Sequence, residues 1–490
     1  MLEIWLLEMM NNGIAIHWFR QDLRLTDNPS LYEAGEYEYV LPIYILDDEN
    51  AGFFKMGSAS RLWLHHALTS LNNSLENSLT CYQGEALQIL LRLVDALPVK
   101  AVFWNRCYEP WRMKRDKKIK QQLQGKGIFS SSFNGSLLWE PWEINKTDGT
   151  PYKVFTPFYQ KGCLGTHPPR RPIKKPKKIC FYQEITESIS IDKLGLLPKK
   201  SWPQSIEKSW QISETGAHNK ISFFLEKGLS HYKRGRDYPS KPYPSRISPY
   251  LHFGQISPHQ IWEVIRSQEP TEHTAHFCSE LGWREFSYNL LFYNPELPWH
   301  NFQQKFERFP WEDNRTLLEY WRQGKTGIPM VDAGMRELLQ TGYMHNRMRM
   351  IVGSFLVKNL LLHWHHGERW FWECLVDADL ANNSSGWQWI AGCGADAAPY
   401  FRVFNPVTQG QNFDADGTYI RRFIPEIAAL PNTHLFSPWK TPKKILQNAR
   451  VILGQTYPYP IVDLQDSRKR ALAAFKSLSE HKTTILGGGL

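Results

Sequence analysis

The stretch Ile14–Phe19, which reads IAIHWF, decides the fold of the first part of the chain. It is short, apolar and rich in β-branched and aromatic residues, and Tyr39–Leu46 (YVLPIYIL) and residues 101–104 (AVFW) share this character. Such runs are typical of parallel strands that are buried on both faces. Residues 58–75 and 85–97 carry helical apolar spacing between them. This alternation predicts a doubly wound, Rossmann-like α/β domain, and the absence of G-x-G-x-x-G after the first strand disfavours a nicotinamide site.

The rest of the chain divides by composition. Residues 161–178 (KGCLGTHPPRRPIKKPKK) hold seven Lys or Arg, four Pro and no acid, so they predict a linker that is either solvated or in contact with DNA. From about residue 205 the pattern is helical, as in the long amphipathic run 344–363. Ser248 and Ser257 each precede a proline and predict capped helix starts. The expected domains are α/β over 13–140, a linker over 141–204 and an all-α domain over 205–480.

Composition bounds the function classes. The chain has 490 residues, and 58 Lys or Arg against 48 Asp or Glu give a net charge of +10, which suits a polyanionic partner. Aromatic residues make up 14%, with 20 Trp, more than packing alone requires. Seven cysteines without a C-x-x-C favour a reducing, cytoplasmic location over a disulfide framework. No apolar run is long enough to span a membrane, and residues 1–12 lack the features of a signal peptide.

The densest chemical constellation is MHNRMRM, residues 344–350. On a helix, Asn346 and Met350 are four apart and share a face, with Arg349 at its edge. An amide beside a thioether suits an aromatic heterocycle with hydrogen-bonding edges, such as a flipped base. The alternative interpretation is a core helix with one satisfied asparagine.

A second constellation is ELGWREFS, residues 280–287. Glu280, Trp283, Arg284 and Ser287 lie at i, i+3, i+4 and i+7, which is one stripe of a helix. The stripe offers an acid, a stacking platform and a phosphate-binding guanidinium. The alternative is a core tryptophan with a surface ion pair.

Two further polar stretches are candidate ligand sites. Residues 376–389 (VDADLANNSSGWQW) are interpreted as a polar segment between helices that is costly to bury unless a ligand satisfies it. Residues 244–248 (PSRIS) place hydroxyls and a guanidinium at a helix N-terminus, which suits a phosphate. We expect no metal site, because His363, His365 and His366 have no acidic or thiol partner at ligand spacing.

Together these segments resemble the photolyase/cryptochrome flavoprotein family over nearly the whole chain. HWFRQDLRLTDN (17–28) resembles its opening strand and loop, and YKVFTPF (152–158) its linker-proximal motif. GKTGIPMVDAGMREL, MHNRMRM, DADLANNSSGWQW and YFRVFNPVTQG follow in family order. The resemblance implies an N-terminal antenna domain, a helical FAD-binding domain and light-driven chemistry on DNA.

The resemblance also implies which residues contact FAD. Arg349 is expected to pair with Asp377 beneath the flavin, and Asn383 to face flavin N5. Pro244 stands where the family often has Thr, and Phe277 where it often has Trp in the FAD site. The implied FAD-binding residues are Tyr232, Pro244, Ser245, Arg246, Ile247, Ser248, Arg349, Asp377, Ala378, Asp379 and Asn383.

The family branches differ at two positions of MHNRMRM. The (6-4) photolyases carry His at the positions of Asn346 and Met350, plant-type cryptochromes tend to carry Asp at the first, and the DASH type Gln at the second. Neither Asn nor Met is a general acid near neutral pH. The pair therefore resembles class I-like enzymes that repair cyclobutane pyrimidine dimers (CPDs). The implied catalytic residues, which would hold a dimer flipped out of the duplex, are Glu280, Trp283, Asn346, Met350 and Trp389.

Further roles follow from the same resemblance. Trp311, Trp364 and Trp387 are the implied electron-transfer chain to the flavin. Glu109 resembles the acid that holds a methenyltetrahydrofolate antenna, although a deazaflavin antenna or none stays open. The implied DNA contacts, beyond a basic run at 106–126, are Arg236, Glu280, Trp283, Arg284, Ser287, Asn346, Arg347 and Gln409.

We expect a monomer that binds damaged DNA. The alternatives are a cryptochrome-type blue-light signalling protein without repair activity and a DNA-binding module with a vestigial flavin site. The short C-terminal tail and the Asn346/Met350 pair favour the enzyme.

Overall fold

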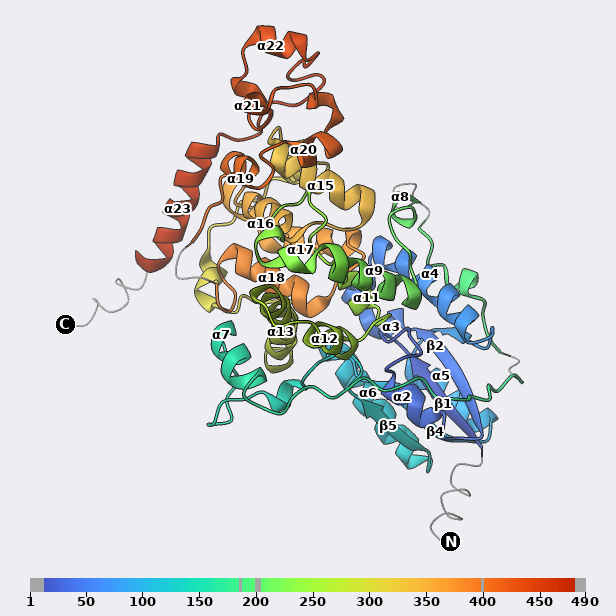
Figure 1. Ribbon diagram of the computed structural model, residues 1–490. Coiled ribbons are helices and arrows are strands. Elements are labelled where there is room, and N and C mark those ends of the chain that lie inside the picture. Colours follow the sequence, from blue (N-terminus) through green and yellow to red (C-terminus); the bar gives the residue numbers. More distant parts are fainter. Residues whose placement is uncertain (1–12, 185–186, 199–203, 398–400, 481–490) are drawn as a thin grey trace, which may run out of the picture. The chain divides into compact units, whose positions relative to one another are not determined.

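The structure is a computed structural model that describes residues 13–184, 187–198, 204–397 and 401–480 (Figure 1). The chain forms two compact units. Unit 1 takes its described residues from 1–201, 207–226 and 245–295, and unit 2 from 202–206, 227–244 and 296–490. These units cut across the expected linker and helical domain, so the three boundaries given above stay a prediction.

A parallel sheet of five strands forms the first part of unit 1 (Figure 1). Strand β1 is buried along its whole length and pairs with β2 (Ile14 with Tyr39) and β4 (Ala15 with Ala101). The predicted α/β fold is confirmed, whereas β3 and β5 were not expected from their short, polar sequences. In the order β3-β2-β1-β4-β5 the strands are β3 (Thr80–Gln83), β2 (Tyr39–Leu46), β1 (Ile14–Phe19), β4 (Val99–Asn105) and β5 (Phe129–Phe133).

Helices cover this sheet because their apolar faces match its buried residues. Ile16, Leu90 and Ile119 belong to one core cluster that joins the sheet to α5 and α6. The strand order reverses beside β1, and in such sheets the reversal opens a crevice at the carboxyl ends of the strands. The helices of this region are α2 (Pro29–Ala34), α3 (Asp48–Ala51), α4 (Ser58–Ser74), α5 (Ala86–Ala96), α6 (Pro110–Gly125) and α7 (Phe155–Pro157).

The second part of unit 1 is helical. Ser257 caps α12 through a capping box with Gln260, as predicted. The cap predicted at Ser248 is wrong by one residue: α11 begins at Ser248 and Ile247 occupies the cap position. The helices are α9 (Glu214–Lys227), α11 (Ser248–His252), α12 (Pro258–Arg266) and α13 (Glu272–Tyr293), and α8 (Gln204–Glu207) has residues 204–206 in unit 2 and Glu207 in unit 1.

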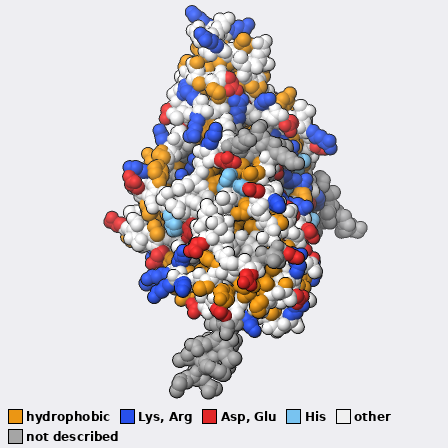
Figure 2. Space-filling model, turned by 90° about the vertical axis from the view of Figure 1, so that its right-hand side faces the viewer, with side chains coloured by type: hydrophobic (Ala, Val, Ile, Leu, Met, Phe, Trp, Pro, Cys, Tyr) orange, Lys and Arg blue, Asp and Glu red, His pale blue; other side chains and the backbone are white. Residues whose placement is uncertain are grey.

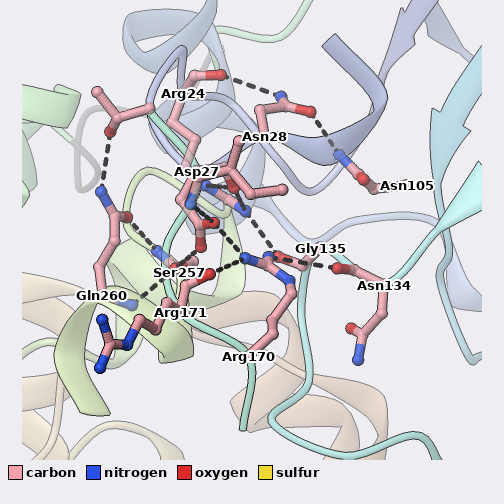
Figure 3. Close-up of polar contacts among 12 residues, drawn as sticks. Arg24, Asp27, Asn28, Asn105, Asn134, Gly135, Arg170, Arg171, Ser257 and Gln260 are labelled. Carbon is pink, nitrogen blue, oxygen red and sulfur yellow. Dashed lines mark hydrogen bonds and ion pairs between the residues drawn. The ribbon is translucent and has the colours of Figure 1, made fainter. Parts of the chain in front are cut away.

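A buried polar network joins the two parts of unit 1 (Figure 3). Asp27 accepts from Arg170 of the basic segment at 2.5 Å and from the Ser257 hydroxyl. Arg24 donates to the carbonyl oxygens of Gly254 and Gly135 at 2.9 and 2.7 Å. Burial alone would raise the pKa of Asp27, but Arg24 and Arg170 outweigh it and lower that pKa. Part of the basic segment 161–178 therefore anchors unit 1 and is not simply a solvated connection.

Unit 2 is all-helical in its described residues, as predicted. The expected run 344–363 is not one helix, because α16 ends at Ser354, a π-helical turn follows (Phe355–Asn359) and Leu361 has a positive φ of 54°. None of the helices described for the chain is long and apolar enough to cross a membrane. The helices of unit 2 are α10 (Tyr232–Gly235), α14 (Arg315–Arg322), α15 (Pro329–Thr341), α16 (Asn346–Ser354), α17 (Trp364–Cys374), α18 (Leu380–Ala391), α19 (Pro406–Phe413), α20 (Thr418–Phe423), α21 (Asn432–Leu435), α22 (Lys443–Asn448) and α23 (Leu464–Glu480).

Candidate active site

An ion pair between Arg349 and Asp377 joins α16 to the segment before α18 in unit 2. Arg349 Nη2 donates to both carboxylate oxygens of Asp377, at 2.9 and 2.8 Å, and its Nε donates to the carbonyl oxygen of Met344 at 2.8 Å. Burial disfavours the guanidinium charge, but the Asp377 carboxylate outweighs it and raises the pKa of Arg349. The predicted pair thus forms, with a fixed cation and a buried anion that suit the polar edge of a flavin ring.

The polar stretch 376–389 is mostly helix, so the interpretation of a segment between helices is wrong. Asp379 caps α18 by accepting from the Asn382 backbone N–H at 2.9 Å, which draws the following residues into the helix. Asn383 on this helix donates to the carbonyl oxygen of Glu368 at 3.0 Å. Ser384 donates to the Glu368 carboxyl at 2.5 Å, and burial raises the pKa of Glu368 to about 8. Burial therefore favours the uncharged form of Glu368.

The three predicted electron-transfer tryptophans all lie in unit 2. Trp387 and Trp364 are buried, whereas Trp311 is half-buried. Trp364 Nε1 donates to Asn301 Oδ1 at 2.9 Å. A Cβ on Gly367 would lie 2.1 Å from the Trp387 ring, so glycine there lets the ring pack directly against α17. The His363 ring lies 5.1 Å from Trp311 and 5.6 Å from Trp364 between ring centroids.

The Asn346 and Met350 side chains share an accessible face of α16. Asn346 is exposed and Met350 half-buried, whereas Met348, Ile351 and Val352 are buried on the other side of the helix. The core-helix interpretation therefore does not apply to the Asn/Met pair. On α18, Trp389 is half-buried and its Nε1 donates to the carbonyl oxygen of Asp396 at 3.2 Å.

The predicted stripe on α13 lies in unit 1, and its members are engaged differently. The half-buried Trp283 ring stacks on Phe155 with 3.8 Å between centroids and 11° between planes. Glu280 lies 3.7 Å from the His276 imidazole. Arg284 pairs with Glu285 at 3.0 Å, and Ser287 donates to the carbonyl oxygen of Trp283 at 3.1 Å. Three of the four groups thus have a partner within α13, while Trp283 keeps an accessible part of its ring.

The segment 244–248 contains one strained residue. Arg246 has a positive φ of 52°, and its guanidinium lies 4.5 Å above the Trp210 ring. Backbone strain of this kind persists where surrounding structure holds it, and it is common at ligand sites. Phe277, which stands where a tryptophan is common, is buried against Phe224 at 4.7 Å.

The implied DNA contacts differ in whether their side chains already have partners within the protein. Arg347 pairs with Asp237 at 2.8 Å and lies 4.3 Å from the Phe413 ring centroid, so it supports the loop before α11 as well as offering charge. Arg236 lies over the Tyr232 ring at 5.6 Å, and the Gln409 side-chain carbonyl has no partner among the described residues. On the face in Figure 2, basic side chains are interspersed with acidic ones and form no single patch.

A pocket opens in unit 1 at the carboxyl ends of β1 and β2. Its walls include the rings of Trp18 and Trp111 and the guanidiniums of Arg20, Arg112 and Arg115. Glu109, the predicted antenna residue, is not in the pocket wall, but it pairs with Arg112 at 3.3 Å. Its second carboxylate oxygen is buried without a partner among the described residues, which suits a ligand that brings a donor.

Several site residues were missed from the sequence. Two of the pocket arginines, Arg112 and Arg115, lie in the basic run 106–126, which also fits a solvated helix face, and their position at the sheet edge is set by topology. Phe155 belongs to the quoted YKVFTPF motif, but its contact with Trp283 joins positions far apart in sequence. The burial of Glu368 could not be predicted from the sequence, because a single glutamate in a helix is normally a surface residue.

Comparison with known proteins shows the family. Residues 15–177 match the family described as DNA photolyase, and residues 277–477 match the FAD binding domain of DNA photolyase. The chain therefore belongs to the photolyase/cryptochrome family and contains its FAD-binding domain.

Individual relatives span almost the whole chain. A deoxyribodipyrimidine photo-lyase of Agrobacterium fabrum is 44% identical over 96% of this chain and 98% of its own. Cryptochrome-1 of Arabidopsis thaliana is 33% identical over 96% of this chain and 71% of its own. The crystal structure of a bacterial class III photolyase from Agrobacterium tumefaciens has a TM-score of 0.92 and 43% identity, covering 96% of this chain and 98% of that one. The class I-like character expected from the sequence stays a prediction.

Proposed function

We propose that the chain is a light-driven DNA photolyase that splits cyclobutane pyrimidine dimers. The observation that carries the dimer specificity is the accessible face of α16, where Asn346 and Met350 offer an amide and a thioether but no titratable proton. Splitting a cyclobutane ring requires an electron, whereas reversal of a (6-4) adduct also requires proton transfer. A face without an acid therefore fits the first reaction.

The donor set of the chain fits FAD. Hydroxyls of Ser245 and Ser248 with the Arg246 guanidinium suit a pyrophosphate, and the Arg349–Asp377 pair suits the hydrogen-bonding edge of a flavin ring. When bound and reduced, FAD supplies the electron that light excites. The remaining proposed contacts are Tyr232, Pro244, Ile247, Ala378, Asp379 and Asn383.

The proposed substrate is a dimer turned out of the DNA duplex. The residues proposed to contact the dimer are Glu280 and Trp283 of unit 1 and Asn346, Met350 and Trp389 of unit 2: indoles suit stacking on bases, the carboxyl and amide suit hydrogen bonds to base edges, and the thioether suits packing. Arg236, Arg284, Ser287, Arg347 and Gln409 are the proposed backbone contacts. Because Arg284 and Arg347 already hold carboxylates, we expect each of them to contribute less to phosphate binding than a free surface arginine.

The tryptophans have a separate proposed role. Trp387, Trp364 and Trp311 pass electrons inward to restore the reduced cofactor, and none of them takes part in splitting the dimer. The pocket at the sheet edge, with two indole rings and three arginines, is the proposed place for an antenna chromophore with anionic groups. Folate and deazaflavin both meet this description.

Repair itself tests the proposal. Protein loaded with FAD and chemically reduced is mixed with an oligonucleotide that contains one thymine dimer, and restored thymines are followed by chromatography. We expect repair under near-UV light and none in the dark. A protein that takes up FAD but repairs nothing in the light would instead support the signalling alternative, and equal turnover in light and dark would exclude photochemistry.

A further inference from the structure

A stack of three aromatic rings ends at Trp283. The Phe155 ring is parallel to the Trp283 ring, with 3.8 Å between centroids and 11° between planes, and to the Tyr159 ring, with 5.6 Å and 10°. Phe155 and Tyr159 are buried, whereas Trp283 is half-buried. The indole is thus stacked on a buried ring that also packs against a second buried ring.

The segment that carries this stack is held against α13 at three further points. A Cβ on Gly282 would lie 2.4 Å from the Tyr159 ring, so the glycine lets that ring lie against the helix backbone. Glu285 accepts from the Leu138 backbone N–H at 2.8 Å, and Asn289 donates to the carbonyl oxygen of Pro141 at 3.1 Å. The three α13 positions follow helical spacing and form one face.

The segment and the accessible stripe of α13 are therefore linked through Phe155, which stacks on Trp283, and through Glu285, which accepts from Leu138 and pairs with Arg284. The face formed by Gly282, Glu285 and Asn289 fixes where residues 138–159 lie, and Phe155 transmits that position to the Trp283 ring. An exposed tryptophan on a helix can adopt several χ angles, and each one that must be frozen on binding lowers affinity. A ring already held in one orientation avoids this cost.

We propose that Phe155 is a positioning residue that holds the Trp283 indole in the orientation needed to stack on the damaged base. This inference rests on the proposed function, because it takes Trp283 as a wall of the lesion pocket. Phe155 itself does not touch the DNA. The structure thus assigns a role in lesion recognition to the linker-proximal segment, in addition to its role as a connection.

Phe155→Leu tests the proposal, because leucine keeps an apolar side chain and removes the ring face. We expect affinity for dimer-containing DNA to fall about threefold to tenfold, the range that a lost aromatic pair corresponds to. Affinity for undamaged DNA and the salt dependence of binding should not change, since no charge is altered. Phe155→Tyr keeps the ring face and should recover the affinity.

Phe158→Leu is the matched control. Phe158 is buried in the same segment, but it packs on Phe286 at 5.1 Å and makes no ring contact with Trp283. We expect it to lower thermal stability without lowering lesion affinity. If Phe155→Leu does not fold, Phe155→Met takes its place with the same expectation.

A double-mutant cycle separates positioning from general support. In a Trp283→Ala background, Phe155→Leu should have no further effect on lesion affinity, because the ring it positions is gone. Equal losses in both backgrounds, equal losses on damaged and undamaged DNA, or unchanged affinity of Phe155→Leu would each overturn the inference. A wild-type protein that does not prefer dimer-containing DNA would instead overturn the proposed function.

Discussion

The sheet edge of unit 1 and the tryptophan chain of unit 2 both bury ionisable side chains, and they treat charge in opposite ways. At the sheet edge, Asp116 binds Arg20 at 2.5 Å and Arg115 at 2.9 Å. Burial alone would raise the pKa of Asp116, but the two guanidiniums outweigh it and lower that pKa. Charges at the sheet edge are therefore kept and compensated.

On and next to α17, which carries Trp364, burial instead favours the uncharged forms of three ionisable groups. Burial lowers the pKa values of His363 and His365 to about 4 and raises that of Glu368 to about 8. A buried charge beside an indole would shift its oxidation potential strongly, because the local dielectric constant is low. The comparison teaches that the same chain can keep a buried charge by pairing it and can remove a buried charge by shifting its pKa.

The largest effect is expected when Trp387, the tryptophan proposed to lie nearest the flavin, is replaced. Trp387→Phe should slow photoreduction of oxidised flavin by orders of magnitude, because phenylalanine keeps most of the packing but is far harder to oxidise. Repair by chemically reduced protein should be retained. Absorbance of the flavin under illumination measures the first effect, and loss of repair in the pre-reduced variant would show that Trp387 has another role.

The second largest effect is expected when the buried ion pairs at the sheet edge are broken. Asp116→Asn leaves Arg20 and Arg115 without their shared carboxylate, and removing one partner of a buried pair costs about 3 kcal/mol in the free energy of unfolding. Urea denaturation measures the loss. A loss similar to that of an exposed ion pair, below about 1 kcal/mol, would mean that water reaches these arginines and that the sheet edge is not a closed charge network.

The third and smallest effect concerns Glu368 and its pH dependence. Below about pH 4.5, Glu368→Gln should change the free energy of unfolding by less than about 1 kcal/mol, because an amide replaces a carboxyl that is uncharged in both the folded and the unfolded chain. The pH dependence of stability from Glu368 is opposite to that of a typical paired carboxylate, whose contribution to stability increases as the pH rises. The folded pKa, about 8, lies above the ordinary value of 4.5, so the unfolded chain releases this proton first.

Stability of the wild type relative to Glu368→Gln should accordingly fall as the pH rises from 4.5 to about 8, and it should stay level above that. Urea denaturation of both proteins across this range measures the difference. A wild type that gains stability relative to the variant over the same window would show that Glu368 is ionised and paired, which contradicts burial favouring its uncharged form.

The two regions also differ in how far the sequence could predict them. Strand β1 was predicted because a short apolar run rich in β-branched and aromatic residues is typical of a buried strand. The Arg349–Asp377 pair was predicted from the resemblance to the family motif. Strands β3 and β5 were missed, since TCYQ and FSSSF acquire strand character only by pairing with β2 and β4. Tertiary context decides such short polar strands.

The candidate site residues show the same division between features set by local sequence and features set by tertiary contacts. The accessible Asn346–Met350 face follows from helical spacing, which is local. The pairing of Arg347 with Asp237 and the stack of Trp283 on Phe155 depend on segments that only the fold brings together. Local periodicity therefore predicted which residues share a face, but not which charges and rings were already engaged.

Lesion type tests the central claim most directly. Reduced protein is illuminated separately with CPD-containing and (6-4)-containing oligonucleotides, and restored bases are followed by chromatography. The face of α16 that carries Asn346 and Met350 predicts repair of the first and none of the second. Asn346→His with Met350→His should impair dimer repair, because two bulky, partly charged rings would enter the dimer pocket. Efficient repair of the (6-4) product by the wild type would contradict the account.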